Sequence, residues 1–200
     1  KIVVLAERDK IEMDEEIRHE TNFGIKNVIT RSGSPTNIND LNLINFNESK
    51  SIIILSDESV DTSEERNISV LKTLMALVNH PNRKEGSFHI IASLDEARFI
   101  QAAKSIAHDE VEILYSREIL AKVIAQTCRQ PGLPVVFQEI LSFDGNELYF
   151  EKTNANGSTF GDLLLQYKHA CAIGICDKNQ KITLKEIDLK SSCVVLFKLK

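Results

Sequence analysis

The chain begins with KIVVLAERDK (residues 1–10), in which a short β-branched and apolar run ends in Glu-Arg-Asp. Such a run predicts a parallel strand that is buried on both faces. Acids that directly follow a parallel strand are typical of nucleotide-binding folds, where the first acid meets a ribose. In that fold the acid belongs to the second strand, and a glycine-rich turn comes before it. The sequence therefore predicts a Rossmann-like sheet whose first strand is missing from this chain.

The chain as far as residue 116 alternates between strand-like and helix-like stretches. Further apolar runs lie at 26–32, 50–55, 87–93 and 111–116, and amphipathic stretches separate them at 9–20, 37–46, 64–79 and 97–107. This spacing predicts right-handed βαβ crossovers and a parallel sheet, which is the α/β fold class, over residues 1–116. Loss of a central strand would leave a hydrophobic gap, which we expect another segment of the full protein to fill.

The pattern changes after residue 116. Two apolar helices are predicted on either side of QPGLP (130–134), because proline and glycine end the first helix and start a tight turn. This crossover hairpin spans 117–143, and its free apolar face needs a cover, for which a partner subunit is one candidate. Short alternating strands, a capped helix at 158–167 and a turn at 177–179 predict a small α+β lobe over 144–200.

The composition predicts a folded, soluble chain. It has 200 residues, 42% of them hydrophobic, and its net charge of -5 gives no general attraction to nucleic acid or to an anionic membrane. No apolar run approaches the roughly 18–20 residues that span a bilayer, and no signal peptide precedes the first strand. A start without methionine suggests a fragment of something longer. The four cysteines form no CxxC pair, so we expect them to be reduced and buried in a cytosolic protein.

Two polar stretches follow the first two predicted strands, at the edge where open parallel sheets bind ligands. Glu7 could accept hydrogen bonds from ribose hydroxyls, or it could be a solvated acid at a helix start. Ser32 and Gly33 could contact a ligand, or they could belong to an ordinary strand–helix loop. Both interpretations stay open for each stretch.

A third polar stretch, SDESVD (56–61), follows the next strand. Its acids Asp57, Glu58 and Asp61, with Glu7 and Asp9 from the first loop, could supply oxygen ligands to a hard cation such as Ca²⁺. The spacing is not that of an EF-hand, and a solvated acidic helix start is the alternative interpretation.

Catalytic motifs are absent from the sequence. None of the five histidines has a serine, cysteine or carboxylate partner in a known local motif, and no HExxH, GxSxG or P-loop occurs. A binding or regulatory role is therefore favoured over an enzyme. A fragment of an NAD(P)-dependent oxidoreductase shares the opening strand and acid, but it needs a catalytic Lys, Tyr or His that we cannot identify.

Four separated stretches, taken in order, carry a resemblance to a known family. VVLAERDK (3–10), VITRSGSP (28–35), IIILSDES (52–59) and QTCRQPGL (126–133) resemble the cytosolic module of Castor/Pollux-type ion channels. That module is related to the RCK (regulator of conductance of K⁺) and TrkA-type domains of potassium channels and transporters. The resemblance implies a Rossmann-like RCK lobe at 1–116, a helix-turn-helix crossover that pairs subunits at 117–143, and a TrkA-C-like lobe at 144–200.

The resemblance also implies a function. Such modules form homo-oligomers, as dimers of lobes and tetrameric gating rings, at the cytosolic face of a membrane pore. Their ligands are Ca²⁺ or a nucleotide of the NAD or ATP class. By position, Glu7 matches the ribose acid, Ser32 and Gly33 match the loop beside the adenine, and Asp57 with Glu58 faces the same cleft. The glycine-rich turn is missing, and a TrkA-type regulatory subunit that docks on a separate membrane protein stays as an alternative.

Overall fold

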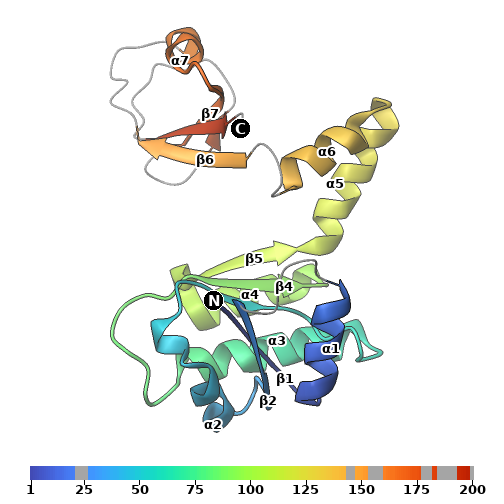
Figure 1. Ribbon diagram of the computed structural model, residues 1–200, viewed down its shortest axis with the longest axis vertical. Helices are drawn as coiled ribbons and strands as arrows, with labels where there is room; N and C mark the ends of the chain where they lie inside the picture. The colour runs from blue at the N-terminus through green and yellow to red at the C-terminus, as the bar shows by residue number, and fades with distance from the viewer. Residues whose placement is uncertain (21–26, 143–146, 153–159, 177–181, 184–192, 199–200) are drawn as a thin grey trace. The chain divides into compact units, whose positions relative to one another are not determined.

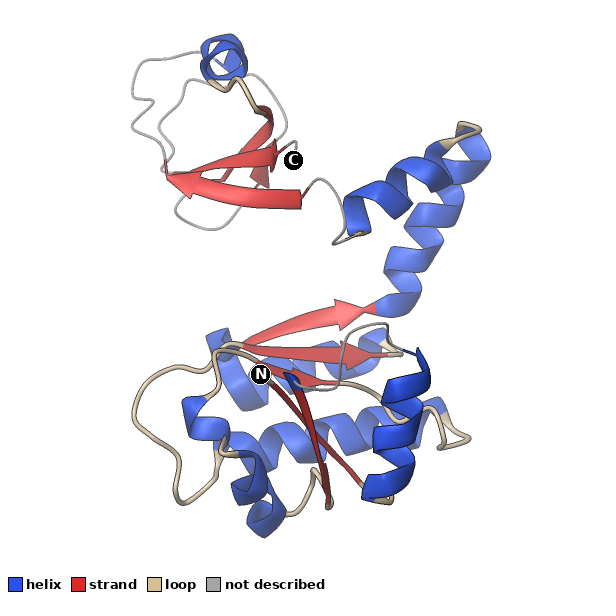
Figure 2. Ribbon diagram, viewed as in Figure 1, coloured by secondary structure: helices blue, strands red, loops and turns tan. Residues whose placement is uncertain are grey.

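The computed structural model describes residues 1–20, 27–142, 147–152, 160–176, 182–183 and 193–198 (Figure 1). The chain divides into two compact units, residues 1–121 and 122–200. Helices and strands alternate through the first unit, whereas the described strands of the second unit all come after a pair of consecutive helices (Figure 2).

The described part of the first unit contains five strands, all paired in parallel. β1 (Ile2–Ala6) pairs with β2 (Val28–Ser32) in one sheet. A second sheet has the order β3 (Ile52–Ile54), β4 (Ile90–Leu94) and β5 (Val111–Tyr115). Four of these strands fall within a predicted run, β4 extends one residue beyond its run, and every pairing is parallel, so the predicted α/β class is confirmed. The described strands of this unit thus form two separate parallel sheets.

Helices α3 (Ser63–Val78) and α4 (Ile100–Ala107) pack on the second sheet. Their apolar side chains and those of the strands form one core, in which Leu74 and Leu94 are fully buried. The first sheet carries α1 (Lys10–Glu20), which packs Met13 inward and leaves Ile11 exposed. The first unit therefore has its core between α3, α4 and the β3–β4–β5 sheet.

The predicted helix at 37–46 is broken into shorter pieces. α2 (Ile38–Leu41) is followed by two 3₁₀ turns, η2 (Asn42–Ile44) and η3 (Phe46–Glu48). Asn45 between them has a left-handed conformation with φ 50°, which ends a regular helix. Two further 3₁₀ turns, η4 (Ala97–Phe99) and η5 (His108–Glu110), flank α4.

The predicted helical hairpin is present. α5 (Ser116–Arg129) and α6 (Leu133–Leu141) are joined by a turn in which Gly132 has φ 95°, a conformation that favours glycine. α6 begins before Pro134, which is tolerated in the first turn because its missing N–H would have no helical partner there. Neither helix contains a buried residue.

The C-terminal sheet is antiparallel, in the order β6 (Glu147–Lys152), β9 (Cys193–Lys198), β7 (Ala170–Cys176) and β8 (Ile182–Thr183). α7 (Phe160–Gln166) packs on it, and the core cluster comprises Leu163, Ala172 and Ile175. β7 contains one extra residue relative to β9, a bulge between Ala172 and Gly174. The turn predicted at 177–179 lies outside the described residues.

The prediction of buried cysteines is wrong for two of the four. Cys128 and Cys171 are free thiols, but both are exposed. Cys128 lies on α5, which buries no residue, and Cys171 alternates with the buried Ala172 along β7. Strand alternation places Cys171 on the face away from α7.

Candidate functional site

The loop after β1 contains the first two predicted site residues. Glu7 is exposed directly after the strand. Asp9 caps α1, because its Oδ1 accepts hydrogen bonds from the backbone N–H groups of Ile11 at 2.8 Å and Glu12 at 3.3 Å. Asp9 therefore has a structural role at the helix start, whereas Glu7 faces solvent at the end of the strand.

The loop after β2 is held by bonds within the chain. Ser32 is the exposed last residue of β2, and the Gly33 N–H donates to the Ala6 carbonyl at 3.0 Å, which ties the ends of β1 and β2 together. The Ser34 N–H donates to Asp40 Oδ2 at 2.9 Å. A Cβ on Gly33 would lie 3.1 Å from the Asp40 Cβ, so close packing explains the glycine. The backbone N–H groups of Gly33 and Ser34 therefore already have hydrogen-bond acceptors within the chain.

The loop after β3 contains the predicted cation-binding acids. Asp57 accepts hydrogen bonds from the Ser59 hydroxyl at 2.6 Å and the Ser59 N–H at 2.9 Å. These bonds, with a smaller contribution from the positive charge of Arg8, lower the pKa of Asp57, which is ionised at neutral pH. The positive charge of Arg8, which follows β1, thus acts on a carboxylate of the loop after β3.

Glu58 and Asp61 are exposed on the same loop as Asp57. Within the part of the chain that the structure describes, no three His, Cys, Asp or Glu side chains gather closely enough to hold a metal ion. Asp57, Glu58 and Asp61 are thus three acidic residues of one loop. Their role as cation ligands stays a prediction.

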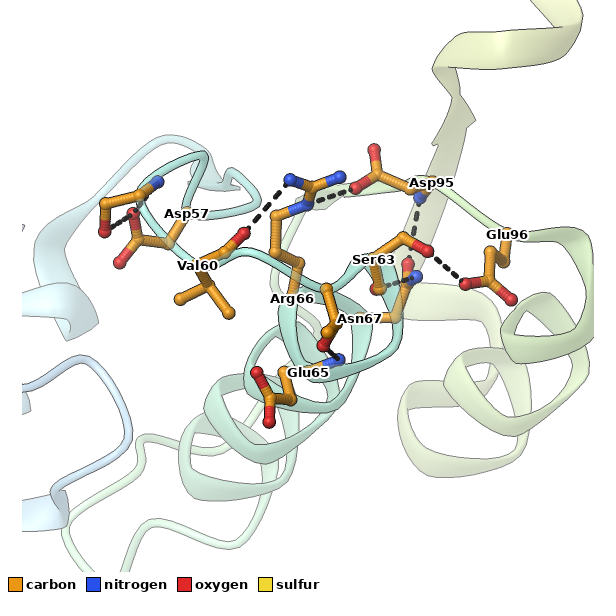
Figure 3. Close-up of polar contacts among 10 residues, drawn as sticks. Asp57, Val60, Ser63, Glu65, Arg66, Asn67, Asp95 and Glu96 are labelled. Atoms are coloured by element: carbon orange, nitrogen blue, oxygen red, sulfur yellow. Dashed lines mark hydrogen bonds and ion pairs between the residues drawn. The ribbon is translucent and has the colours of Figure 1, made fainter.

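Sequence reasoning missed a polar network that links the ends of β3 and β4 (Figure 3). Arg66, in the first turns of α3, donates from Nε to Asp95 Oδ2 at 2.9 Å and from Nη1 to the Val60 carbonyl at 3.1 Å. The Arg66 and Asp95 side chains are 21% and 15% exposed, so water screens this ion pair only in part. Arg66 thereby connects the loop after β3 to the loop after β4.

Asn67 forms the buried centre of this network and is completely inaccessible to solvent. Its Nδ2 donates to the Ser63 carbonyl at 2.5 Å, and its Oδ1 accepts the Asp95 N–H at 2.9 Å. The Ser63 hydroxyl in turn donates to Glu96 Oε1 at 2.5 Å. This bond and a second one from Arg98 lower the pKa of Glu96. These hydrogen bonds join the start of α3 to the loop after β4, and Arg66 extends the network to the loop after β3.

Two signals in the sequence could have identified this network. Asp95-Glu96 follows a predicted strand just as Asp57-Glu58 does, and the same rule about strand ends applies to both pairs. Asn67 lies three residues before Val70 and seven before Leu74 on α3, the spacing of a buried helix face, where a polar side chain needs a partner.

Comparison with solved structures supports the fold. The structure titled "Structure of the human SLO3 gating ring" matches 98% of this chain and 43% of that one, with a TM-score of 0.71 and 14% identity. At this identity the match shows a shared fold alone. It agrees with the order of strands and helices described above.

Comparison with protein families decides the identity. Residues 117–191 match the family described as "Castor and Pollux, part of voltage-gated ion channel". The "Probable ion channel POLLUX" of Oryza sativa subsp. japonica is 32% identical over 189 residues, covering 92% of this chain and 19% of that protein. This chain belongs to the Castor and Pollux family. The "Probable ion channel CASTOR" of the same plant is 31% identical over 193 residues, covering 94% of the module and 21% of that protein.

The Castor/Pollux-type module thus spans about a fifth of the length of these relatives, with 19% and 21% covered. Across the residues that the structure describes, no helix combines the length and apolar character needed to cross a membrane. The candidate site of the module is the edge formed by the loops after β1 and β3, with the Arg66–Asn67 network beside it.

Proposed function

We propose that this module is a ligand-sensing regulatory domain of a cation channel and catalyses no reaction. The observation that supports this most is the 32% identity to an ion-channel protein over 92% of the chain. The pore would belong to parts of the protein outside these 200 residues, and the module would lie on its cytosolic face. The alternative is that the module belongs to a free-standing subunit, which docks on a pore formed by a separate protein.

The proposed sensor is the edge formed by the loops after β1 and β3. Asp57 is held ionised by Ser59 and lies within electrostatic reach of Arg8, so a charged ligand at this edge would interact with both loops. Arg66 bonds to Val60 in the loop after β3 and to Asp95 after β4, so a shift of one loop displaces the other. A ligand that favours one loop arrangement by about 1–3 kcal/mol would suffice for regulation.

Two ligand classes are proposed for this edge, Ca²⁺ and a nucleotide of the NAD or ATP class. Thermal unfolding of the purified chain with each ligand tests them. We expect one ligand to raise the melting temperature, and the D57N/E58Q double variant to lose that increase. The matched control is E85Q/D109N, which removes the same two charges from exposed positions elsewhere. An equal increase in both double variants would remove Asp57 and Glu58 from the site, and no increase with either ligand would refute sensing at this edge.

Oligomerisation is proposed to involve both helices of the hairpin. Ile124 on α5 is 53% exposed, and on α6 Val135 is 68% and Leu141 73% exposed. Large apolar side chains exposed on helices that bury no residue are typical of an interaction surface. We propose that the hairpin pairs two subunits and that pairs assemble into a tetrameric ring.

Sedimentation velocity tests the pairing surface. I124D should dissociate the oligomer, because a buried unpaired charge is costly. A125D adds the same charge one position along and about 100° around the helix, so it should leave the oligomer intact. An oligomer that survives I124D would place the pairing surface elsewhere.

The regulatory function itself is tested by cation flux through the native protein in liposomes. D57N/E58Q should change the ligand concentration that half-activates flux and preserve conduction, because these residues would act on gating. Unchanged ligand dependence of flux, with folding intact, would refute the regulatory role of this edge.

A further inference from the structure

The carboxylate of Glu96 joins two elements at the end of β4 (Figure 3). Its Oε1 accepts a hydrogen bond from the hydroxyl of Ser63, the first residue of α3, at 2.5 Å, and its Oε2 accepts one from Arg98 Nε at 2.7 Å. Arg98 also lies 3.3 Å from a carboxylate oxygen of Glu64, and its guanidinium lies over the Phe99 ring, 4.8 Å from the ring centroid. Glu96 therefore fastens the loop after β4 to the start of α3.

α5 begins where β5 ends, with no loop between them (Figure 1). Tyr115 is the last residue of β5, and Ser116 is the first residue of α5. β4 and β5 are parallel neighbours, and their register ends at the pair Leu94 and Tyr115. Glu96 and Arg117 each lie two residues beyond this pair, so both follow the carboxyl ends of adjacent strands. The first turn of α5 therefore starts beside the loop that contains Glu96.

The positive charge of Arg117 acts on Glu96. The hydrogen bonds from Ser63 and Arg98 lower the pKa of Glu96 most, and the positive charges of Arg98 and Arg117 lower it further. Arg117 is exposed, and within the described part of the chain it makes no hydrogen bond or ion pair. Glu96 is thus bonded to one arginine, while a second arginine without a partner lies close enough to attract it.

We propose that Arg117 is a positioning residue, which competes with Arg98 for the Glu96 carboxylate and thereby couples the loop after β4 to the start of α5. In this structure Arg98 holds the carboxylate. One acid serves two arginines on different elements, so the population in which Glu96 bonds to Arg117 grows whenever its bond to Arg98 is weakened. In that second arrangement the first turn of α5 is tied to the loop after β4.

The cause of such a change rests on the proposed function, and the coupling adds a route from the ligand to the hairpin. Arg66 bonds to the Val60 carbonyl in the loop after β3 and to Asp95, the residue before Glu96. A shift of the loop after β3 would therefore move the Glu96 carboxylate relative to both arginines. α5 is the first helix of the hairpin that is proposed to pair subunits, so pairing would depend on the ligand.

Hydrogen exchange in the native polypeptide, without ligand, tests the coupling itself. We expect R117Q to speed the exchange of amides at 116–124 roughly two- to fivefold, the range for an exposed ion pair, and R117K to keep the wild-type rate. R98Q should slow this exchange, because Glu96 then bonds to Arg117 instead. In an E96Q background R117Q should have no further effect. R129Q removes the same charge from the other end of α5 and is the matched control, which should leave the rate unchanged.

Cation flux through the native protein in liposomes separates this inference from the proposed function. Flux is recorded against Ca²⁺ and against NAD⁺ as the two probes. R117Q should change the half-activating concentration of the effective probe roughly two- to fivefold, and R129Q should not. A wild-type flux that responds to neither probe, with the coupling present in hydrogen exchange, would refute the ligand proposal and support the coupling.

Four results would overturn the inference. The first is exchange at 116–124 that is the same in R117Q and in the wild type. The second is faster exchange in R98Q, which would mean that the two arginines do not compete. The third is an equal effect of R117Q with and without E96Q, which would give Arg117 a different partner. The fourth is an unchanged half-activating concentration in R117Q when the wild type responds, which would refute the route to the hairpin.

Discussion

Replacing Asn67 with alanine tests the polar network most directly. Asn67 is fully buried, and its side chain makes two hydrogen bonds, to the Ser63 carbonyl and from the Asp95 N–H. N67A removes both bonds and leaves the Asp95 N–H without its side-chain acceptor. The variant should therefore destabilise the first unit while leaving the second unit unchanged.

The magnitude follows from these contacts. Two hydrogen bonds contribute about 2 kcal/mol net, and a buried donor left unsatisfied costs about 1–2 kcal/mol more. Alanine is the better helix former, which returns about 0.5 kcal/mol. The net loss in free energy of unfolding is about 3 kcal/mol, which corresponds to roughly 6–12 °C in melting temperature for a domain of this size.

Urea unfolding followed by circular dichroism measures this loss, and hydrogen exchange of α3 and β4 peptides localises it. The control is N79A at the C-cap of the same helix, where the exposed side chain donates one hydrogen bond to the Met75 carbonyl at 2.9 Å. That variant should change the stability by about 0.5 kcal/mol or less. An N67A loss no larger than that of N79A would refute the claim that the network holds the two loops together.

Three further predictions concern single contacts. G33A should cost about 1 kcal/mol in urea unfolding, because its Cβ would lie 3.1 Å from the Asp40 Cβ; a stabilised variant would contradict this. R83M should lower the free energy of unfolding by about 2 kcal/mol, because Arg83 Nη2 lies 2.6 Å from Glu110 Oε1 and both side chains are mostly buried. The R83M/E110M double variant should lose less stability than the sum of the two single variants. Additive losses would refute the coupling between the two side chains. The lowered pKa of Asp57 stabilises the folded state at pH values above the pKa of this side chain in the unfolded chain, about 3.9, and this stabilisation is lost as the pH falls through the lower pKa of the folded state. D57N should therefore reduce the difference in stability between pH 6 and pH 3. An unchanged difference would contradict the assignment.

The strands of the first unit could be predicted from sequence because each is a β-branched run with charged or turn residues around it, as in IVVLA (2–6) and VEILY (111–115). The short length of α2 could not, since the apolar spacing fits a longer helix, whereas the backbone passes into a 3₁₀ turn after Leu41 and is left-handed at Asn45. The exposure of Cys128 could not be predicted either, because it depends on what covers the hairpin rather than on local pattern.

The candidate site was predicted in part. Strand-end rules direct attention to these loops, and in the structure Glu7 follows β1, Ser32 ends β2 and Asp57 lies in the loop after β3. They could not show that Asp9 caps a helix, nor that the Gly33 N–H is taken by Ala6, because both depend on the path of the backbone after the strand. The role of Asn67 depends on a contact with Asp95, 28 positions further along the chain, which local periodicity does not show.

The extra residue in β7 determines which side of the C-terminal sheet its neighbours face. Ala172 and Ile175 are both buried against Leu163, although residues three apart in a regular strand point to opposite sides. The bulge after Ala172 reverses this parity, so removal of Ile173 would turn either Ala172 or Ile175 out into water. Substitutions along β7 can be absorbed one at a time, whereas the loss or gain of one residue there would dismantle the small core beneath α7.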